Sequence, residues 1–162
     1  MKVRDVMVET PAYCDTDMDL GRAVEILWTF NCGFLPVVDS QKKVVGVITD
    51  RDICIALGTR NRLPGEITVG EVNSGKVYTC RSTDDIRRAL TTMSTHKVRR
   101  LPVVHADGRL EAILSLDDII LETRTRRISD PLELSSEEVV DTLKHVCAPY
   151  IPVATQTKIT AA

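Results

Sequence analysis

Leu-Pro-Val-Val at residues 35–38 recurs at residues 101–104, which lie 66 residues further along a chain of 162 residues. The same offset aligns residues 3–58 with residues 69–124 without a gap and gives 13 identities in 56 pairs. Average composition gives only about three or four identities by chance. The chain therefore contains an internal repeat. Because one copy of this size buries too little apolar surface to be comfortably stable alone, we expect the two copies to pack together.

Each copy predicts the order strand, helix, strand, strand, helix. In the first copy, apolar residues recur at helical spacing over residues 20–27. Residues 34–38 and 44–48 are apolar runs bounded by a polar turn, which is typical of short buried strands. The second copy repeats this pattern at the same offset. The fold class expected is α+β (α/β), with two β-α-β-β-α repeats packed face to face around one shared core. A pseudo-twofold axis is expected to relate the repeats and to create two equivalent clefts between them.

Short polar side chains mark the expected starts of helices, because an oxygen atom there accepts from free backbone amides. Asp17 or Asp19 is expected to cap the first helix of copy one, and Thr83 that of copy two. The second helices are expected to begin near Asp50 and near Leu116.

Four segments follow from the repeat: a first repeat at residues 1–60, a polar linker at residues 61–68, a second repeat at residues 69–127, and a C-terminal helix and tail at residues 128–162. The C-terminal helix is marked by a capping box and an apolar stripe, and the end of the tail, residues 154–162, is expected to be frayed or disordered. We expect the helix to pack on its own core, with a dimer contact as the alternative. Its residues are Ser135 and Glu138 for the box and Val139, Val140, Leu143 and Val146 for the stripe.

Composition excludes several classes of protein. A formal charge of -2, from 21 basic and 23 acidic residues, argues against nucleic acid as a partner of the whole chain. The sequence contains no run of about 18 apolar residues, so we expect no membrane insertion. The first residues lack the apolar core of a signal peptide, so a cytoplasmic location is expected. Aromatic residues make up 4%, which predicts an aliphatic core.

Five cysteines, far apart and odd in number, do not form a zinc motif, and the three histidines do not group. We therefore expect no metal site, no catalytic residue and no required cofactor, with each cysteine packed as a small hydrophobe in a reducing compartment.

Thr49 and Asp52 lie where a strand is expected to end and a helix to begin. This spacing has two interpretations. In one, Thr49 caps the helix, and the Asp52 carboxylate interacts favourably with the positive N-terminal end of the helix. In the other, Asp52 accepts from the hydroxyl groups of a ribose, while Thr49 and the free helix amides serve a ribose or a phosphate. Ser115 and Asp118 repeat the pattern in copy two.

This duplicated pattern, together with Gly-Val-Ile-Thr at residues 46–49 and Asp-Arg-Asp-Ile at residues 50–53, resembles a tandem pair of cystathionine-beta-synthase (CBS) domains, also called a Bateman module. The resemblance covers residues 1–126. It implies a β-α-β-β-α fold for each copy, head-to-head pairing through the sheets, and two clefts that bind adenine nucleotides or related molecules. It also implies a sensor for a partner enzyme, channel or transporter, and a homodimer whose expected form is a disc of two modules.

Within the resemblance, each cleft joins the Thr/Ser-x-x-Asp turn of one copy to the first strand of its neighbour and to the residues before the neighbour's Leu-Pro-Val-Val. Asp52 is then expected to bind ribose hydroxyls, Thr49 a ribose or phosphate oxygen, and aliphatic side chains the base. Lys76, Arg99 and Arg100 are candidates for neutralising phosphate, with a solvated basic patch as the alternative. The first cleft is expected to contain Val47, Thr49, Asp52, Lys76, Thr79, Val98, Arg99 and Arg100.

The second cleft has no comparable basic cluster and is expected to be the weaker site. Phe34 is expected either to stack on a base or to fill the cleft itself. Ala112, which replaces the Gly46 of copy one, is expected to narrow the approach. The second cleft is expected to contain Thr10, Tyr13, Cys32, Gly33, Phe34, Ile113, Ser115 and Asp118.

The function favoured by the sequence is a non-enzymatic regulatory module that binds an adenosine-containing ligand, such as AMP, ADP, ATP, NAD or S-adenosylmethionine, between its repeats. A regulated protein partner would read the resulting arrangement. A ligand-free interaction scaffold is the alternative, because a fold does not imply a function. An enzyme is less favoured, because the sequence contains no catalytic triad, phosphate loop or dinucleotide fingerprint.

Overall fold

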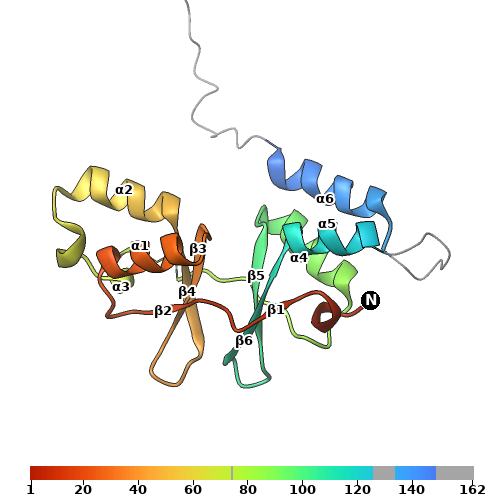
Figure 1. Cartoon of the computed structure of the whole chain (residues 1–162), viewed down its shortest axis with the longest axis horizontal. Helices are drawn as coiled ribbons and strands as arrows, with labels where there is room; N and C mark the ends of the chain where they lie inside the picture. The colour runs from red at the N-terminus through yellow and green to blue at the C-terminus, as the bar shows by residue number, and fades with distance from the viewer. Residues whose placement is uncertain (74, 126–133, 149–162) are drawn as a thin grey trace, which may run out of the picture.

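The computed structural model describes residues 1–73, 75–125 and 134–148. It consists of two similar halves that lie side by side, with the two sheets towards the centre and the helices towards the outside (Figure 1). Each sheet has three strands, in the order β2-β3-β4 in one half and β1-β6-β5 in the other. The α+β fold and the pairing of two repeats are therefore as predicted. No helix among the described residues is long and apolar enough to span a membrane.

The first half is built from β2 (Cys14–Asp15), α1 (Leu20–Thr29), β3 (Phe34–Val38), β4 (Val44–Thr49) and α2 (Asp50–Arg60). Its α1 begins where the Asp19 carboxylate accepts from the Arg22 amide, which confirms Asp19 as the cap. All five residues of β3 are buried, because this strand lies in the middle of its sheet. Its antiparallel register with β4 places Phe34 opposite Thr49, at the start of α2.

The second half is built from α4 (Ile86–His96), β5 (Arg100–Val104), β6 (Leu110–Ser115) and α5 (Leu116–Thr125). Arg100 lies opposite Ser115, which is the register of the first half moved by the repeat offset. The expectation that Thr83 caps α4 is wrong. Asp85 caps this helix, because it immediately precedes Ile86 and its carboxylate accepts from the Arg87 amide.

The two halves exchange their N-terminal segments. The 3₁₀ helix η1 (Val3–Asp5) and the strand β1 (Val8–Glu9) precede the first half in sequence but pack on the second, where β1 pairs with β6. In return, η2 (Pro64–Glu66) and α3 (Val69–Val72) pack on the first half. The exchange is symmetric: the Val3 amide donates to the Asp84 carbonyl at 3.0 Å, and the Val69 amide donates to the Met18 carbonyl at 2.8 Å.

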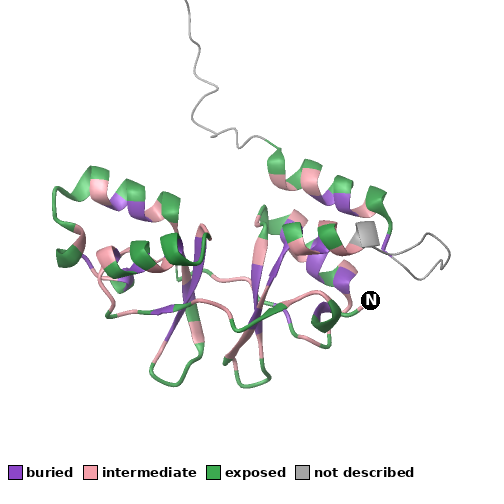
Figure 2. Cartoon of the chain, viewed as in Figure 1, coloured by how far each residue is buried: buried purple, intermediate pink, exposed green. Residues whose placement is uncertain are grey.

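The expectation of one shared core is wrong, because the buried side chains form two clusters, one in each half. Val3 is fully buried in the cluster of the second half. Val69 is fully buried in the cluster of the first half, and so is Ile67, which belongs to the segment 61–68 expected to be the linker. Buried residues therefore lie in both halves (Figure 2). The halves are thus joined by exchanged apolar anchors.

The helix α6 (Ser136–Cys147) packs on α4 and α5, which confirms packing on its own core. Ser135 and Glu138 form the predicted capping box. The predicted apolar stripe is only partly correct: Val139 is buried, but Val140 is 47% exposed, and Thr142 is buried in its place because it shares a face with Val139. The end of the predicted tail, residues 154–162, lies outside the described residues.

Arg87 of α4 holds α6 through Glu138. Its Nε lies 2.6 Å from Oε1, and its Nη2 lies 3.4 Å from Oε2. This hydrogen-bonded guanidinium, together with the Ser135 amide, lowers the pKa of Glu138 to about 2. The ion pair therefore stabilises the docked helix at pH values above the ordinary pKa of a glutamate. This contribution to stability is lost as the pH falls towards 2.

We expect Glu138→Gln to lower the free energy of unfolding at neutral pH and to lose this difference from the wild type between pH 4.5 and pH 2. Urea titrations at a series of pH values measure it. Glu137→Gln, on the exposed side of the same turn, is the control and should leave the pH profile unchanged. A constant difference between wild type and Glu138→Gln down to pH 2 would contradict this assignment.

All five cysteines are free. Burial raises the pKa of Cys14 and of Cys80 to about 12, so neither thiol is a nucleophile at neutral pH. The expectation that every cysteine packs in the core is wrong for Cys54 and Cys147, which are exposed on outward faces of α2 and α6.

Candidate functional site

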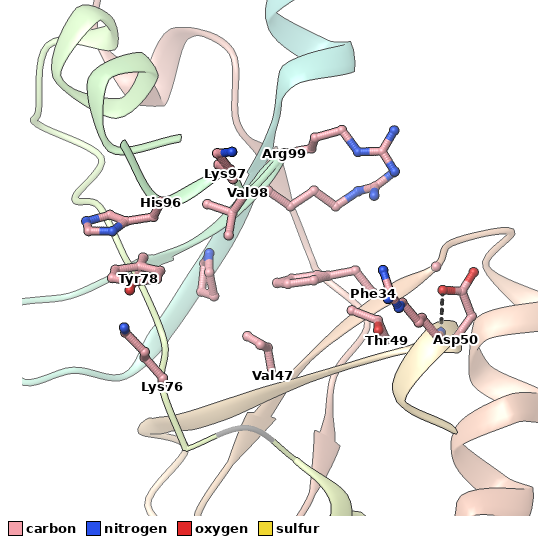
Figure 3. Close-up of a pocket in the computed structure, with 14 residues that line it drawn as sticks. Phe34, Val47, Thr49, Asp50, Lys76, Tyr78, His96, Lys97, Val98 and Arg99 are labelled. Atoms are coloured by element: carbon pink, nitrogen blue, oxygen red, sulfur yellow. Dashed lines mark hydrogen bonds between the residues drawn. The ribbon is translucent and has the colours of Figure 1, made fainter. Parts of the chain in front are cut away.

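A cavity of about 650 Å³ lies between the two halves (Figure 3). One side is formed by the end of β4 and the start of α2, and the other by the segment before β5 together with residues 76 and 78. These are the segments that the resemblance to CBS domain pairs implies for the first cleft. The lining residues are Gly33, Phe34, Val47, Thr49, Asp50, Arg51, Lys76, Tyr78, His96, Lys97, Val98, Arg99, Arg100 and Pro102.

The turn from β4 to α2 is fixed by a reciprocal capping box. The Thr49 amide and hydroxyl donate to Asp52 Oδ2 at 2.9 and 2.7 Å, and the Asp52 amide donates to Thr49 Oγ1 at 3.2 Å. Thr49 lines the cavity, whereas Asp52 is not among the lining residues. The capping interpretation is thus realised, with the Thr49 hydroxyl bonded to Asp52.

Cationic side chains dominate the charge of this cavity. Five of its lining residues carry a positive charge and only Asp50 carries a negative one, although the whole chain has a formal charge of -2. Arg100 is partly neutralised by Asp117, at 3.4 Å. For Arg99, the described residues provide no side-chain hydrogen bond or ion pair, so its guanidinium is available to an anion. The five cations are Arg51, Lys76, Lys97, Arg99 and Arg100.

One end of the cavity is aromatic. The rings of Tyr78 and His96 stack with centroids 3.7 Å apart, and Lys76 Nζ lies 5.5 Å from the centre of the Tyr78 ring. The hydrogen bond to the Tyr78 side chain raises the pKa of Lys76, which therefore stays protonated. Figure 3 shows Val47 and Val98 directed into the cavity between this end and Thr49. An apolar floor beside cations suits a ligand with a flat apolar ring and an anionic group.

The sequence found six of these lining residues and missed others. Val47, Thr49, Lys76, Val98, Arg99 and Arg100 are in place, but Thr79 instead lines a separate hollow with Arg81 and Asp84. Lys97, the C-cap of α4, has a positive φ of 54°, and its repeat counterpart Asn31, which follows the C-cap Phe30 of α1, has 48°. The residues missed are Asp50, Arg51, Tyr78, His96, Lys97 and Pro102.

The second cleft is much smaller, with a volume of about 200 Å³. Ser115 and Asp118 form the same capping box as Thr49 and Asp52, with both amide hydrogen bonds at 3.1 Å. Two residues predicted for this cleft lie elsewhere. Gly33 lines the first cavity, and Tyr13 lies against Lys42, whose Nζ is 4.1 Å from the ring centre. Of the predicted residues, this cleft contains Thr10, Cys32, Phe34, Ile113, Ser115 and Asp118.

Ala112 does not narrow this cleft, contrary to expectation. Its side chain is fully buried in the core of the second half, because it points to the opposite face of β6 from Ile113. Phe30, Phe34 and Arg100 line the small cleft, and their bulk accounts for its size. Phe34 lines both cavities, so it belongs to the partition between them.

Among residues 1–73, 75–125 and 134–148, no three histidine, cysteine or acidic side chains cluster in a way that could hold a metal ion. In the same part of the chain, no buried side-chain nitrogen or oxygen lacks a hydrogen-bond partner.

Comparison with known proteins gives a match to the family model of the CBS domain at residues 3–59 and again at residues 69–123. Inosine-5'-monophosphate dehydrogenase of Methanocaldococcus jannaschii is 31% identical over 118 residues, which are 73% of this chain and 22% of that protein. The chain spans only about a fifth of the length of the first curated relatives that it matches.

Two solved structures are similar over most of the chain. The CBS domain pair of protein MJ0100, in complex with 5'-methylthioadenosine and S-adenosyl-L-methionine, has a TM-score of 0.70 and 26% identity, and the match covers 78% of this chain and 98% of that one. CBSX2 in complex with AMP has a TM-score of 0.67 and 25% identity, and the match covers 76% of this chain and 96% of that one.

Proposed function

The chain belongs to the CBS domain family and carries two such domains in tandem, and on this premise we propose that it is a non-enzymatic regulatory module whose larger cavity binds a phosphorylated adenosine. The observation that carries the proposal is the apolar floor beside five cations in a cavity between the two halves. A ligand there contacts both halves, so it stabilises one arrangement of them, which a protein partner can read.

Each part of the ligand has a place in this proposal. The base lies between Val47 and Val98, and the ribose lies at the turn where Thr49 faces the cavity. Asp52 acts there as a positioning residue, because its carboxylate holds the Thr49 hydroxyl. Arg99 binds the phosphate with its planar fork of donors, and Lys76 adds a point charge.

Charge favours a phosphorylated ligand over S-adenosylmethionine. The similar structures hold 5'-methylthioadenosine with S-adenosylmethionine in one case and AMP in the other. A sulfonium ion is positively charged and gains nothing from a cavity with five cations and one carboxylate, whereas each added phosphate gains attraction. We therefore place ATP and ADP before AMP and NAD, and S-adenosylmethionine last.

Thermal melts with each of these five ligands test the proposal. A ligand at about 100 times its Kd adds about 2.7 kcal/mol to the free energy of unfolding. This raises the midpoint of thermal unfolding by about 5 °C or more for a chain of this size. Arg99→Ala should weaken binding by about 10- to 100-fold, because it removes a charged hydrogen bond. Arg88→Ala, at an arginine whose side chain is 78% exposed on α4, is the control and should bind like wild type.

Each alternative has its own result. No shift with any of the five ligands would overturn the proposal and favour the ligand-free scaffold. Turnover of a nucleotide that is lost in Arg99→Ala would instead identify an enzyme. A shift with S-adenosylmethionine alone would keep the regulatory module and contradict the phosphate assignment.

A further inference from the structure

The helix α6 is held at both of its ends by side chains from the two ends of α4. At the start of α6, Arg87 pairs with Glu138 at 2.6 Å. At its end, Lys97 Nζ lies 3.5 Å from the carbonyl oxygen of Ala148, the residue that caps α6. The partners are 51 residues apart in both contacts, so the two helices run parallel and share two tethers.

The two tethers differ in their position relative to the larger cavity. Lys97 lines this cavity, and Figure 3 shows it between His96 and Arg99. Arg87 and Glu138 are not among the lining residues. One cation therefore belongs both to the proposed ligand site and to the contact that holds the end of α6.

The backbone of Lys97 sets this residue apart as well. Its φ of 54° is the left-handed conformation, which glycine and asparagine adopt at a helix end with the least cost. The repeat counterpart is indeed an asparagine, Asn31, with a φ of 48°. A costly residue in this conformation is typical of ligand sites and switches, where its side chain has a task. The lysine at this position therefore points to a role for its ammonium group.

Packing is continuous from the wall of the cavity to α6. Tyr78 and Val98, which line the cavity, and Leu143 of α6 all pack against the buried core of the second half. The segment between α4 and β5 also holds the start of α5, because the Leu116 amide donates to the Arg99 carbonyl at 2.9 Å. Since α6 rests on both α4 and α5, a movement of this segment changes the surface beneath α6.

We propose that Lys97 couples ligand binding in the larger cavity to the docking of α6, an inference that rests on the proposed function. A phosphate attracts an ammonium group more strongly than a neutral carbonyl does. A phosphorylated ligand bound to Arg99 therefore draws Lys97 towards the cavity and lengthens its contact with Ala148, which is already long. The pair of Arg87 and Glu138 still holds the start of α6, so only the C-terminal end of the helix loosens.

This coupling makes the end of α6 a reporter of phosphate rather than of the base. A ligand without phosphate leaves Lys97 in contact with Ala148, whereas a phosphorylated ligand competes with that carbonyl for the same ammonium group. The coupling is also reciprocal, because each of two linked sites changes the affinity of the other by the same factor. A protein partner that binds the loosened end of α6 therefore strengthens the binding of the phosphorylated ligand.

Hydrogen exchange without ligand tests the tether itself. Lys97→Asn should let the amides of residues 144–147 exchange about three- to tenfold faster than in wild type, because one hydrogen bond is lost, while those of residues 139–142 keep their rates. Asparagine suits the left-handed conformation, so the end of α4 stays intact. Lys97→Arg keeps the charge and should retain the protection. The matched control is Lys42→Asn, at a second lysine with a positive φ, of 64°, which should leave α6 unchanged.

Hydrogen exchange with ligand tests the coupling. ATP at about 100 times its Kd should accelerate exchange of residues 144–147 in wild type by the same three- to tenfold, about the effect of one lost hydrogen bond. Adenosine, which has no phosphate, should not. In Lys97→Asn, ATP should cause no further change, because the tether is already absent.

Equal exchange of residues 144–147 in wild type and Lys97→Asn without ligand would overturn the tether. ATP that raises the thermal midpoint but leaves α6 unchanged, or adenosine that acts on α6 as strongly as ATP, would overturn the coupling and leave the proposed function intact. No binding of any nucleotide would overturn the proposed function, and the coupling with it.

Discussion

Replacing Val47 by glutamate is expected to reduce the affinity for a phosphorylated adenosine by about 100-fold or more and to remove its stabilising effect on thermal unfolding. Val47 lies on the floor of the larger cavity, beside Thr49 and opposite Val98. A carboxylate there replaces the apolar surface for the base, attracts the cations of the cavity and repels the phosphate, and like charges placed together cost several kcal/mol. Titration calorimetry with ATP measures the loss.

Ile113→Glu is the control that the repeat itself provides. Ile113 occupies the position of Val47 in copy two, is similarly half-buried, and lines the small cleft of about 200 Å³. Its substitution should leave ATP binding within about twofold of wild type. If Ile113→Glu abolished binding and Val47→Glu did not, the nucleotide would belong in the small cleft, and the assignment to the larger cavity would be wrong.

Val3→Asp is expected to destabilise the half of the protein to which Val3 does not belong in sequence. Val3 is fully buried in the apolar core of the second half. An uncompensated buried charge costs at least about 3 kcal/mol. Hydrogen exchange should show lost protection in β5 and β6, while β3 and β4 keep theirs.

Val69→Asp should give the reverse pattern, because Val69 is the equivalent anchor in the core of the first half. If these variants do not fold, Val3→Ala and Val69→Ala test the same exchange with a smaller loss of about 2 kcal/mol each, from the cavity that they leave. Loss of protection in β3 and β4 on substitution of Val3 would contradict the exchange of N-terminal segments.

Local features of the fold could be predicted because they depend on residues close in sequence. The buried strands at residues 34–38 and 44–48, the helix starts at Asp50 and Leu116, and the capping box of α6 all agree with the structure. Each depends on side chains within about one turn or one strand pair, where spacing alone decides which groups meet. Thr83 was a wrong cap because Asp85, two residues on, competes for the same role.

The candidate site was predictable only in part. Arg99 and Arg100 were expected opposite the turn at Thr49 because of the resemblance to CBS domain pairs, whereas the turn itself was marked by the repeat. It gave no signal for the stack of Tyr78 on His96, since the corresponding residues of copy one are Ala12 and Phe30. It also left open whether Asp52 faces a ligand or holds Thr49. In the folded turn, Asp52 Oδ2 accepts from the amide and the hydroxyl of Thr49, so the capping role is present.

By itself, the sequence determined two copies of the order helix, strand, strand, helix and their acidic helix starts, because these follow from local spacing and its recurrence. Tertiary structure decided which half buries Val3 and which buries Val69. Because the two copies are similar, either core could accept either side chain, and the path of the connecting chain decides the outcome. It also decided that α6 covers one helix face and leaves Trp28 exposed on the other. Leu134 and Val139 bury their side chains in the core of the second half, and Arg87 adds an ion pair to Glu138, whereas copy one has a glycine in place of Arg87.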